Sequence, residues 1–166
     1  DLTPNFVLEV GAPVVFGEDA KVTFGGAATS TTADTDANTP EVKYGAKLNF
    51  AGNTTLKFDA ANFNRTALFT AEGTNKGQIT AGDGTKIKLD GANLTWGAYK
   101  LFENFEHAGL KDKLEKGDLT AAEAWKNQVG NNFEIKQNSE GDWMIVAGGT
   151  SVEGSGLNVS AKNLVS

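Results

Sequence analysis

The chain has 166 residues, a formal net charge of −6 and no cysteine. One domain of this length buries a core without metals or disulfides, and the missing cysteines exclude thiolate catalysis and thiolate metal sites. Acidic and basic residues are interspersed, so no nucleic-acid surface is expected, and no apolar run is long enough for a membrane span. Twenty glycines with many Thr and Asn residues predict a single β-rich domain over 1–166.

Alternating apolar and polar residues begin the chain at 6–10 and 22–24. Such alternation predicts half-buried strands, because successive side chains of a strand point to opposite faces. The strongest alternation covers residues 41–50. Its predicted inward residues are Val42, Tyr44, Ala46, Leu48 and Phe50.

Residues 25–40 (GGAATSTTADTDANTP) offer almost nothing that a core can bury. We expect a mobile surface loop there, because burial cannot offset the entropy of ordering it. Asp34, Asp36 and Asn38 stand at positions 1, 3 and 5 of a calcium-loop pattern. The glycine and the bidentate glutamate of that pattern are missing, so no cofactor is expected and calcium is the alternative.

A ten-residue segment at 54–63 (TTLKFDAANF) returns 31 positions later, at 85–94 (TKIKLDGANL). A looser copy at 157–164 (LNVSAKNL) keeps the alternation and the closing Asn-Leu pair. Units of this size stack, because none can bury its apolar face alone. The predicted equivalent inward pairs are Leu56/Ile87, Phe58/Leu89 and Phe63/Leu94, with Lys57 and Lys88 facing outward.

Three aromatic residues follow the repeat, at Trp96, Tyr99 and Trp143. Exposed flat rings would stack on sugars or on an apolar protein surface, which makes these residues candidates for binding. The more ordinary interpretation is that they belong to the core, because aromatic residues on strands usually face inward.

A helical insertion is predicted over about 103–130. Thr120 and Glu123 have the spacing of a capping box, which marks the start of a helix. The apolar stripe that follows consists of Ala121, Ala124, Trp125 and Val129. Such a helix would cover an open end or edge of a sheet.

The single histidine, His107, falls in this region and is interpreted as a solvent-facing residue. It has no cysteine or second histidine to share a metal, and no serine stands in a nucleophile elbow. We therefore expect no catalytic residues and no enzyme. Beyond it, residues 132–137 and 143–147 flank the turn residues 138–142 and predict a β-hairpin.

Four short motifs carry a resemblance: GANL at 91–94, WGAYKLFEN at 96–104, FEI at 133–135 and WMIV at 143–146. In this order they resemble the repeat-rich passenger regions of bacterial autotransporter-like surface adhesins, over most of 41–166. The resemblance implies a parallel β-solenoid held outside the cell or at its surface. The predicted helix and the uneven repeat spacing depart from that pattern, so a β-sandwich stays open.

The expected function is non-enzymatic: adhesion, self-association or structural display by a secreted or surface bacterial protein. The expected partner is a host or bacterial surface protein, a glycan or a second copy of the chain. One alternative is a carbohydrate-binding β-sandwich that uses the exposed aromatic residues. Another is a glycan-active enzyme whose carboxylate pair the sequence does not reveal, since separation in space defines such a pair.

Overall fold

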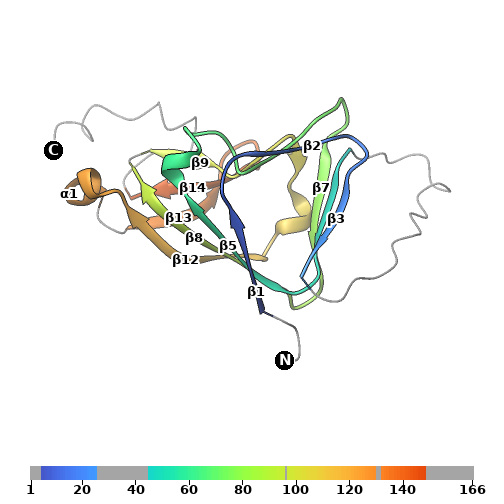
Figure 1. The fold of residues 1–166 in the computed structure, drawn as a ribbon, viewed down its shortest axis with the longest axis horizontal. Coiled ribbons are helices and arrows are strands. Elements are labelled where there is room, and N and C mark those ends of the chain that lie inside the picture. Colours follow the sequence, from blue (N-terminus) through green and yellow to red (C-terminus); the bar gives the residue numbers. More distant parts are fainter. Residues whose placement is uncertain (1–4, 26–44, 96, 130–131, 149–166) are drawn as a thin grey trace.

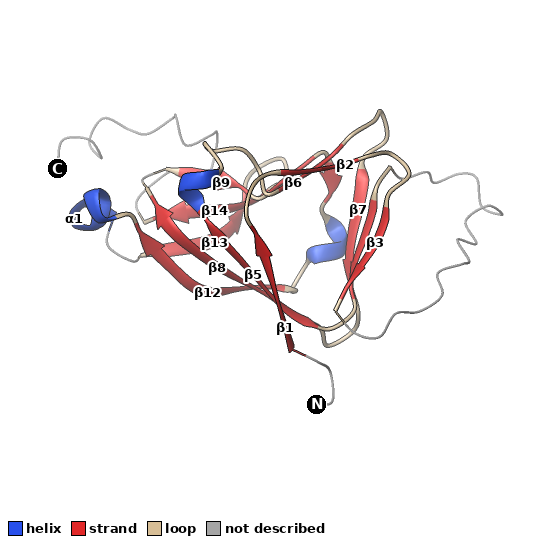
Figure 2. Ribbon diagram, viewed as in Figure 1, coloured by secondary structure: helices blue, strands red, loops and turns tan. Residues whose placement is uncertain are grey.

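The computed structural model describes residues 5–25, 45–95, 97–129 and 132–148. These residues are mainly β and form four sheets, with one short α-helix, α1 (Lys126–Val129) (Figures 1 and 2). No helix among them is long and apolar enough to cross a membrane. The predicted loop beyond Gly25 and the third repeat copy at 157–164 lie outside the described residues.

Three of the sheets are parallel. Sheet A contains, in spatial order, β1 (Asn5–Val10), β5 (Asn53–Asp59), β8 (Ile87–Leu94) and β12 (Leu114–Ala121). Sheet B contains β2 (Val14–Phe16), β6 (Phe69–Ala71) and β10 (Phe102–Glu103). Sheet C contains β3 (Lys21–Phe24), β4 (Lys47–Phe50), β7 (Gly77–Ala81) and β11 (Phe105–Glu106).

The chain visits these sheets in a fixed order. The strands β1, β2 and β3 lie in sheets A, B and C, and β4 adds a second strand to sheet C. The strands β5, β6 and β7 then repeat the order: β5 lies next to β1, β6 next to β2, and β7 next to β4. In Figure 1 sheet B lies along the top, sheet C at the right and sheet A across the lower left. Between them lies one apolar core to which all three contribute, for example Leu56, Phe69 and Ile79.

The predicted inward and outward directions of the side chains at 54–63 and 85–94 are confirmed. The strands β5 and β8 carry the two closest copies and are neighbours in sheet A. All six predicted inward residues are buried, and Lys57 and Lys88 are exposed. However, Leu56 lies opposite Leu89 rather than Ile87, so the structural offset is 33 residues instead of 31. An offset changed by two keeps every side chain on its face, because the period of a strand is two.

The strand predicted at 41–50 is confirmed over 47–50, as β4, whereas Gly45 and Ala46 form a bend before it. Leu48 and Phe50 are buried, and Lys47 and Asn49 alternate with them in half-buried positions. Residues 41–44 lie outside the described residues.

The helical prediction over 103–130 is wrong for most of that range. The region contains β10, β11 and β12, together with the 3-10 turns η3 (Ala108–Leu110) and η4 (Glu123–Trp125). Thr120 lies within β12, and the residue that precedes η4 is Ala122, which makes no side-chain cap. Pairing with β8 supplies β12 with a backbone partner, and this long-range interaction overrides the local capping signal. The helix itself is confirmed only as α1.

The predicted hairpin is confirmed. Strand β13 (Phe133–Gln137) pairs antiparallel with β14 (Trp143–Ala147), and β9 (Ala98–Lys100) adds to the other side of β14 to complete sheet D. Phe133 and Ile145 are fully buried in the main core, so the hairpin closes the core next to β12, which β13 contacts. A further 3-10 turn, η2 (Ala60–Asn62), follows β5, and the Asp59 carboxylate accepts from the Ala61 amide at its start.

Candidate functional site

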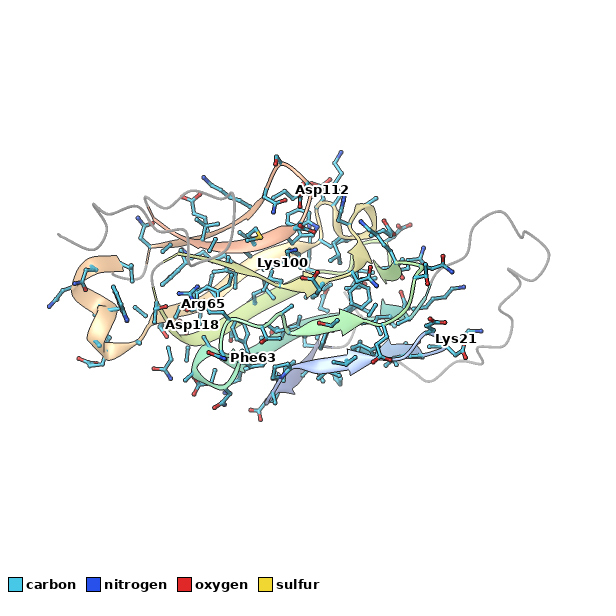
Figure 3. All side chains as sticks on the ribbon, turned by 90° about the horizontal axis from the view of Figure 1, so that it is seen from above. Lys21, Phe63, Arg65, Lys100, Asp112 and Asp118 are labelled. Carbon is cyan, nitrogen blue, oxygen red and sulfur yellow. The ribbon has the colours of Figure 1, made fainter. Side chains whose placement is uncertain are left out.

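The strands β1 and β2 form what we call the open edge. Among the described residues, each has a neighbouring strand on one side only, β5 and β6 respectively. In Figure 3 the N-terminal strands, in blue, lie along one side of the molecule, and the C-terminal hairpin lies along the opposite side. The molecule therefore has two different ends along the direction in which its strands are stacked.

Apolar side chains are exposed on this edge. Val7 of β1 is 60% exposed, and Val14 and Val15 of β2 are 36% and 56% exposed. These are the exposed large hydrophobic residues of the described chain. Val7 and Val15 alternate with residues that face the core, so both point away from it. Exposed apolar residues on strands that have only one neighbouring strand are candidates for an interaction surface.

The apolar core is incompletely covered at the open edge. Leu8 and Phe16 face the core but are only half-buried, whereas their neighbours one strand further in, Leu56 and Ala71, are buried. Val14 likewise lies opposite Phe69, which is 2% exposed. One further strand beside each of β1 and β2 would extend sheets A and B and complete this burial.

The opposite edge of sheet A is protected. Strand β12 has two shifts of register against β8, and its exposed side chains include Glu115, Lys116 and Asp118. The Asp118 amide donates to the Asp90 carboxylate at 2.8 Å, which fixes the irregularity (Figure 3). Bulges and charges of this kind prevent strand addition.

Strand β1 is less protected against strand addition than β12, because it has no register shift and fewer charged residues. It pairs with β5 over six consecutive residues without a shift. Its one charged residue, Glu9, lies 3.9 Å from Lys57 of β5, and both side chains are exposed. A long, regular and partly apolar edge strand is a template for pairing with another strand.

A groove runs across the outer face of sheet A next to the open edge. Its volume is about 560 Å³, and its lining residues are Asn5, Phe6, Val7, Asn53, Thr54, Thr55, Lys86, Lys88 and Glu115. Within it, Val7, Thr55, Lys88 and Glu115 form one row across all four strands. The Asn53 side chain accepts from the Lys86 amide at 2.8 Å, and the Lys86 ammonium donates to the Asp112 carbonyl at 2.8 Å.

The structure places Tyr99 and Trp143 against the main core, both half-buried. The Tyr99 hydroxyl lies 2.8 Å from both the amide and the hydroxyl of Thr95, and the Arg65 guanidinium sits 4.2 Å from its ring centre. The Trp143 indole donates to the His107 carbonyl at 3.4 Å. These contacts give both rings a structural role. Trp96, Asp34, Asp36 and Asn38 lie outside the described residues.

A small ionic cluster ties β9 to the hairpin. The Lys100 ammonium lies 3.3 Å from the Glu103 carboxylate and 3.3 Å from the Asp142 carboxylate (Figure 3). Partial burial by itself lowers the pKa of Lys100, but the two carboxylates outweigh it and raise that pKa above 10.5. Lys100 therefore stays cationic at neutral pH, and the stability that it contributes is lost only as the pH rises through its folded-state pKa.

His107 does not lie in a helix as predicted. It precedes η3, and its ring packs against Gly141 of the hairpin turn. The cavity beside it has a volume of about 10 Å³. This is room for at most one water molecule.

No protein-family model, curated protein or solved structure matches this chain. Within the residues that the structure describes, no group of three or more His, Asp or Glu side chains could hold a metal ion. The candidate sites are therefore defined by geometry: the open edge and the sheet A groove. Sequence reasoning did not single out Val7, Val14 or Val15. The adjacent valines at 14 and 15 were the available signal, since one of two neighbouring strand residues must face outward.

Proposed function

We propose that this chain is a non-enzymatic structural module of a secreted or surface-displayed bacterial protein, and that it self-associates through the open edge. The observation that carries the proposal is the exposure of Val7, Val14 and Val15 at the point where the core ends. We also propose that sheets A, B and C are the three faces of a β-solenoid. The repeated order in which the chain visits them supports that architecture.

Strand addition is the mode of association that fits this edge. A strand placed beside β1 gains main-chain hydrogen bonds along its length and covers apolar side chains at the same time. Burying one exposed valine contributes roughly 1.5 kcal/mol. The valines alone therefore supply only part of a stable interface, and the backbone pairing supplies the directionality.

A charge on the open edge should prevent this association. We expect Val7→Lys and Val15→Lys each to raise the dissociation constant of self-association at least about tenfold, equivalent to about 1.4 kcal/mol. Sedimentation velocity over a series of protein concentrations measures the effect. The matched control is Ala61→Lys, which adds the same charge at an exposed position of η2. A wild-type chain that stays monomeric at every concentration tested would contradict the proposed function.

Glycan binding in the sheet A groove is a second candidate. Its volume of about 560 Å³ lies within the usual range of small-molecule sites, roughly 300–1,000 Å³. Asparagine amides, threonine hydroxyls and lysine ammonium groups line it, and together they offer the donors and acceptors that sugar hydroxyls need. In this second candidate function, the polar groups of the groove would bind the sugar, instead of the aromatic residues that the sequence suggested.

Two substitutions test this candidate. Lys88 is exposed and lines the groove, so Lys88→Ala should remove binding to any glycan that the wild-type chain retains on an array. Lys126→Ala is the control, because this exposed lysine lies on α1, outside the groove lining. Equal glycan binding by both variants would count against the groove, and thermal unfolding would verify that both remain folded.

A further inference from the structure

We propose that the partner at the open edge is the open edge of a second copy. A two-fold axis relates the two copies, so that β1 of one pairs antiparallel with β1 of the other and the two Val7 residues lie opposite each other. This inference rests on the proposed self-association and specifies its partner and geometry. The same surface of both copies forms such a contact, so the assembly closes at the dimer.

The outward residues of β1 direct their backbone groups toward the open edge. In β5, the amide of the buried Thr54 donates to the Lys86 carbonyl, on the side of β8. Successive residues of a strand direct these groups to opposite sides, so the outward residues of β5 bond toward β1. Strand β1 is parallel to β5 and in regular register with it. Its outward residues Asn5, Val7 and Glu9 therefore direct their N–H and C=O groups away from β5, where an antiparallel partner strand can pair with them.

The residue pattern of β1 is self-complementary about Val7. Pairing the two Val7 residues places Asn5 of each copy opposite Glu9 of the other, on the outer face. It also places Phe6 of each copy opposite Leu8 of the other, on the inner face, because opposite residues of an antiparallel pair share a face. Phe6 and Leu8 are half-buried and gain an apolar neighbour in this way. The three outward pairs exchange about six backbone hydrogen bonds.

The charge of β1 favours this register over the one centred on Leu8. With Val7 at the centre, the Glu9 carboxylate lies beside the neutral Asn5 amide, which can donate to it, and keeps Lys57 on its other side. The two Glu9 residues are then four positions apart, about 14 Å along the strands, beyond the distance at which exposed charges interact strongly. With Leu8 at the centre, they are about 7 Å apart and only two hydrogen-bonded pairs remain within β1.

A second copy covers the other edge strands at the same time. Among the described residues, β3 has a neighbouring strand on one side only, as β1 and β2 do. Sheets B and C lie on the other two sides of the core, so a two-fold axis normal to sheet A exchanges them and brings β2 of one copy to β3 of the other (Figure 1). Phe16 of β2 and Phe24 of β3 are half-buried on these strands. A single peptide strand would cover one of the three edge strands, whereas a second copy supplies a strand for each.

Cysteine cross-linking tests this pairing in the full 166-residue chain, which has no cysteine of its own. Under mild oxidation, Val7→Cys should form a covalent dimer, because the paired Cα atoms lie about 5.5 Å apart, within the range that a disulfide spans. Glu9→Cys alone should give at least a tenfold lower yield, since its two copies are about 14 Å apart. Mixing Glu9→Cys with Asn5→Cys should restore the covalent dimer as a heterodimer. Ala61→Cys, at an exposed position of η2, measures random cross-linking.

The size of the wild-type assembly separates this inference from the proposed function. Sedimentation equilibrium should show association that stops at two copies. Assemblies that grow beyond the dimer, or a dimer whose Val7→Cys variant cross-links no better than Ala61→Cys, would overturn the head-to-head pairing but leave self-association standing. A heterodimer of Val7→Cys with Glu9→Cys as the main product of their mixture would overturn the register centred on Val7. A wild-type chain that stays monomeric at every concentration would overturn both proposals.

Discussion

Replacing Phe69 by alanine is expected to lower the free energy of unfolding by about 4 kcal/mol. Phe69 of β6 is 2% exposed, and its ring lies 5.3 Å from that of Phe16, 6.1 Å from that of Phe24 and 6.0 Å from that of Phe102. It therefore connects aromatic residues of sheets B and C. Truncation removes both the buried area and these ring contacts, and the sheets around it cannot close the cavity without moving.

Chemical denaturation of the wild-type chain and the variant measures this effect. The matched control is Val15→Ala, which lies opposite Thr70, the residue after Phe69, but is 56% exposed. Its expected change is within about 0.5 kcal/mol. Both proteins are compared at low concentration, so that association does not add to the apparent stability. A loss below about 1.5 kcal/mol for Phe69→Ala would mean that the aromatic core is far more adaptable than its packing indicates.

Gly109→Ala is expected to destabilise the fold by about 3 kcal/mol, by overpacking. Gly109 lies in η3, and a Cβ there would overlap the carbonyl oxygen of Ile79. That carbonyl belongs to the backbone of β7, which pairs with β4 and β11 on its two sides. It cannot move aside as a flexible side chain would, so η3 must shift away from sheet C.

Gly17→Ala is the control for this substitution. A Cβ at Gly17 meets nothing within 4 Å. The added methyl group reduces the freedom of the unfolded chain and should leave stability unchanged or raise it by up to about 1 kcal/mol. Thermal unfolding of the two variants side by side measures the difference. Equal midpoints would show that η3 is not held against β7.

Much of the local structure could be predicted from the sequence. The alternation at 54–63 and 85–94 predicts which side chains of β5 and β8 face the core, and the burial of Leu56 and Leu89 agrees. The hairpin of β13 and β14 follows from turn residues between two strand patterns. Both features depend on residues close together in the chain, which is why the sequence reveals them.

The helical prediction at 103–130 shows the limit of such local signals. Thr120 and Glu123 fit a capping box, which predicts a helix. This local motif carries no information about whether the same residues pair with a distant strand. The structure pairs Leu114 with Ile87 and Glu115 with Lys88. The partner strand lies 27 positions earlier in the chain. It supplies backbone hydrogen bonds and burial that no local sequence pattern reveals.

The sequence by itself determined that this protein is β-rich, that its repeat has one apolar and one polar face, and that a hairpin lies near residue 140. Only the tertiary structure decided the offset of 33 residues between β5 and β8, because an alternation of period two is satisfied equally by 31 and by 33. Only the tertiary structure also revealed the open edge. Whether Val7 and Val15 are covered depends on which strands become neighbours, and that is a property of the assembled sheets.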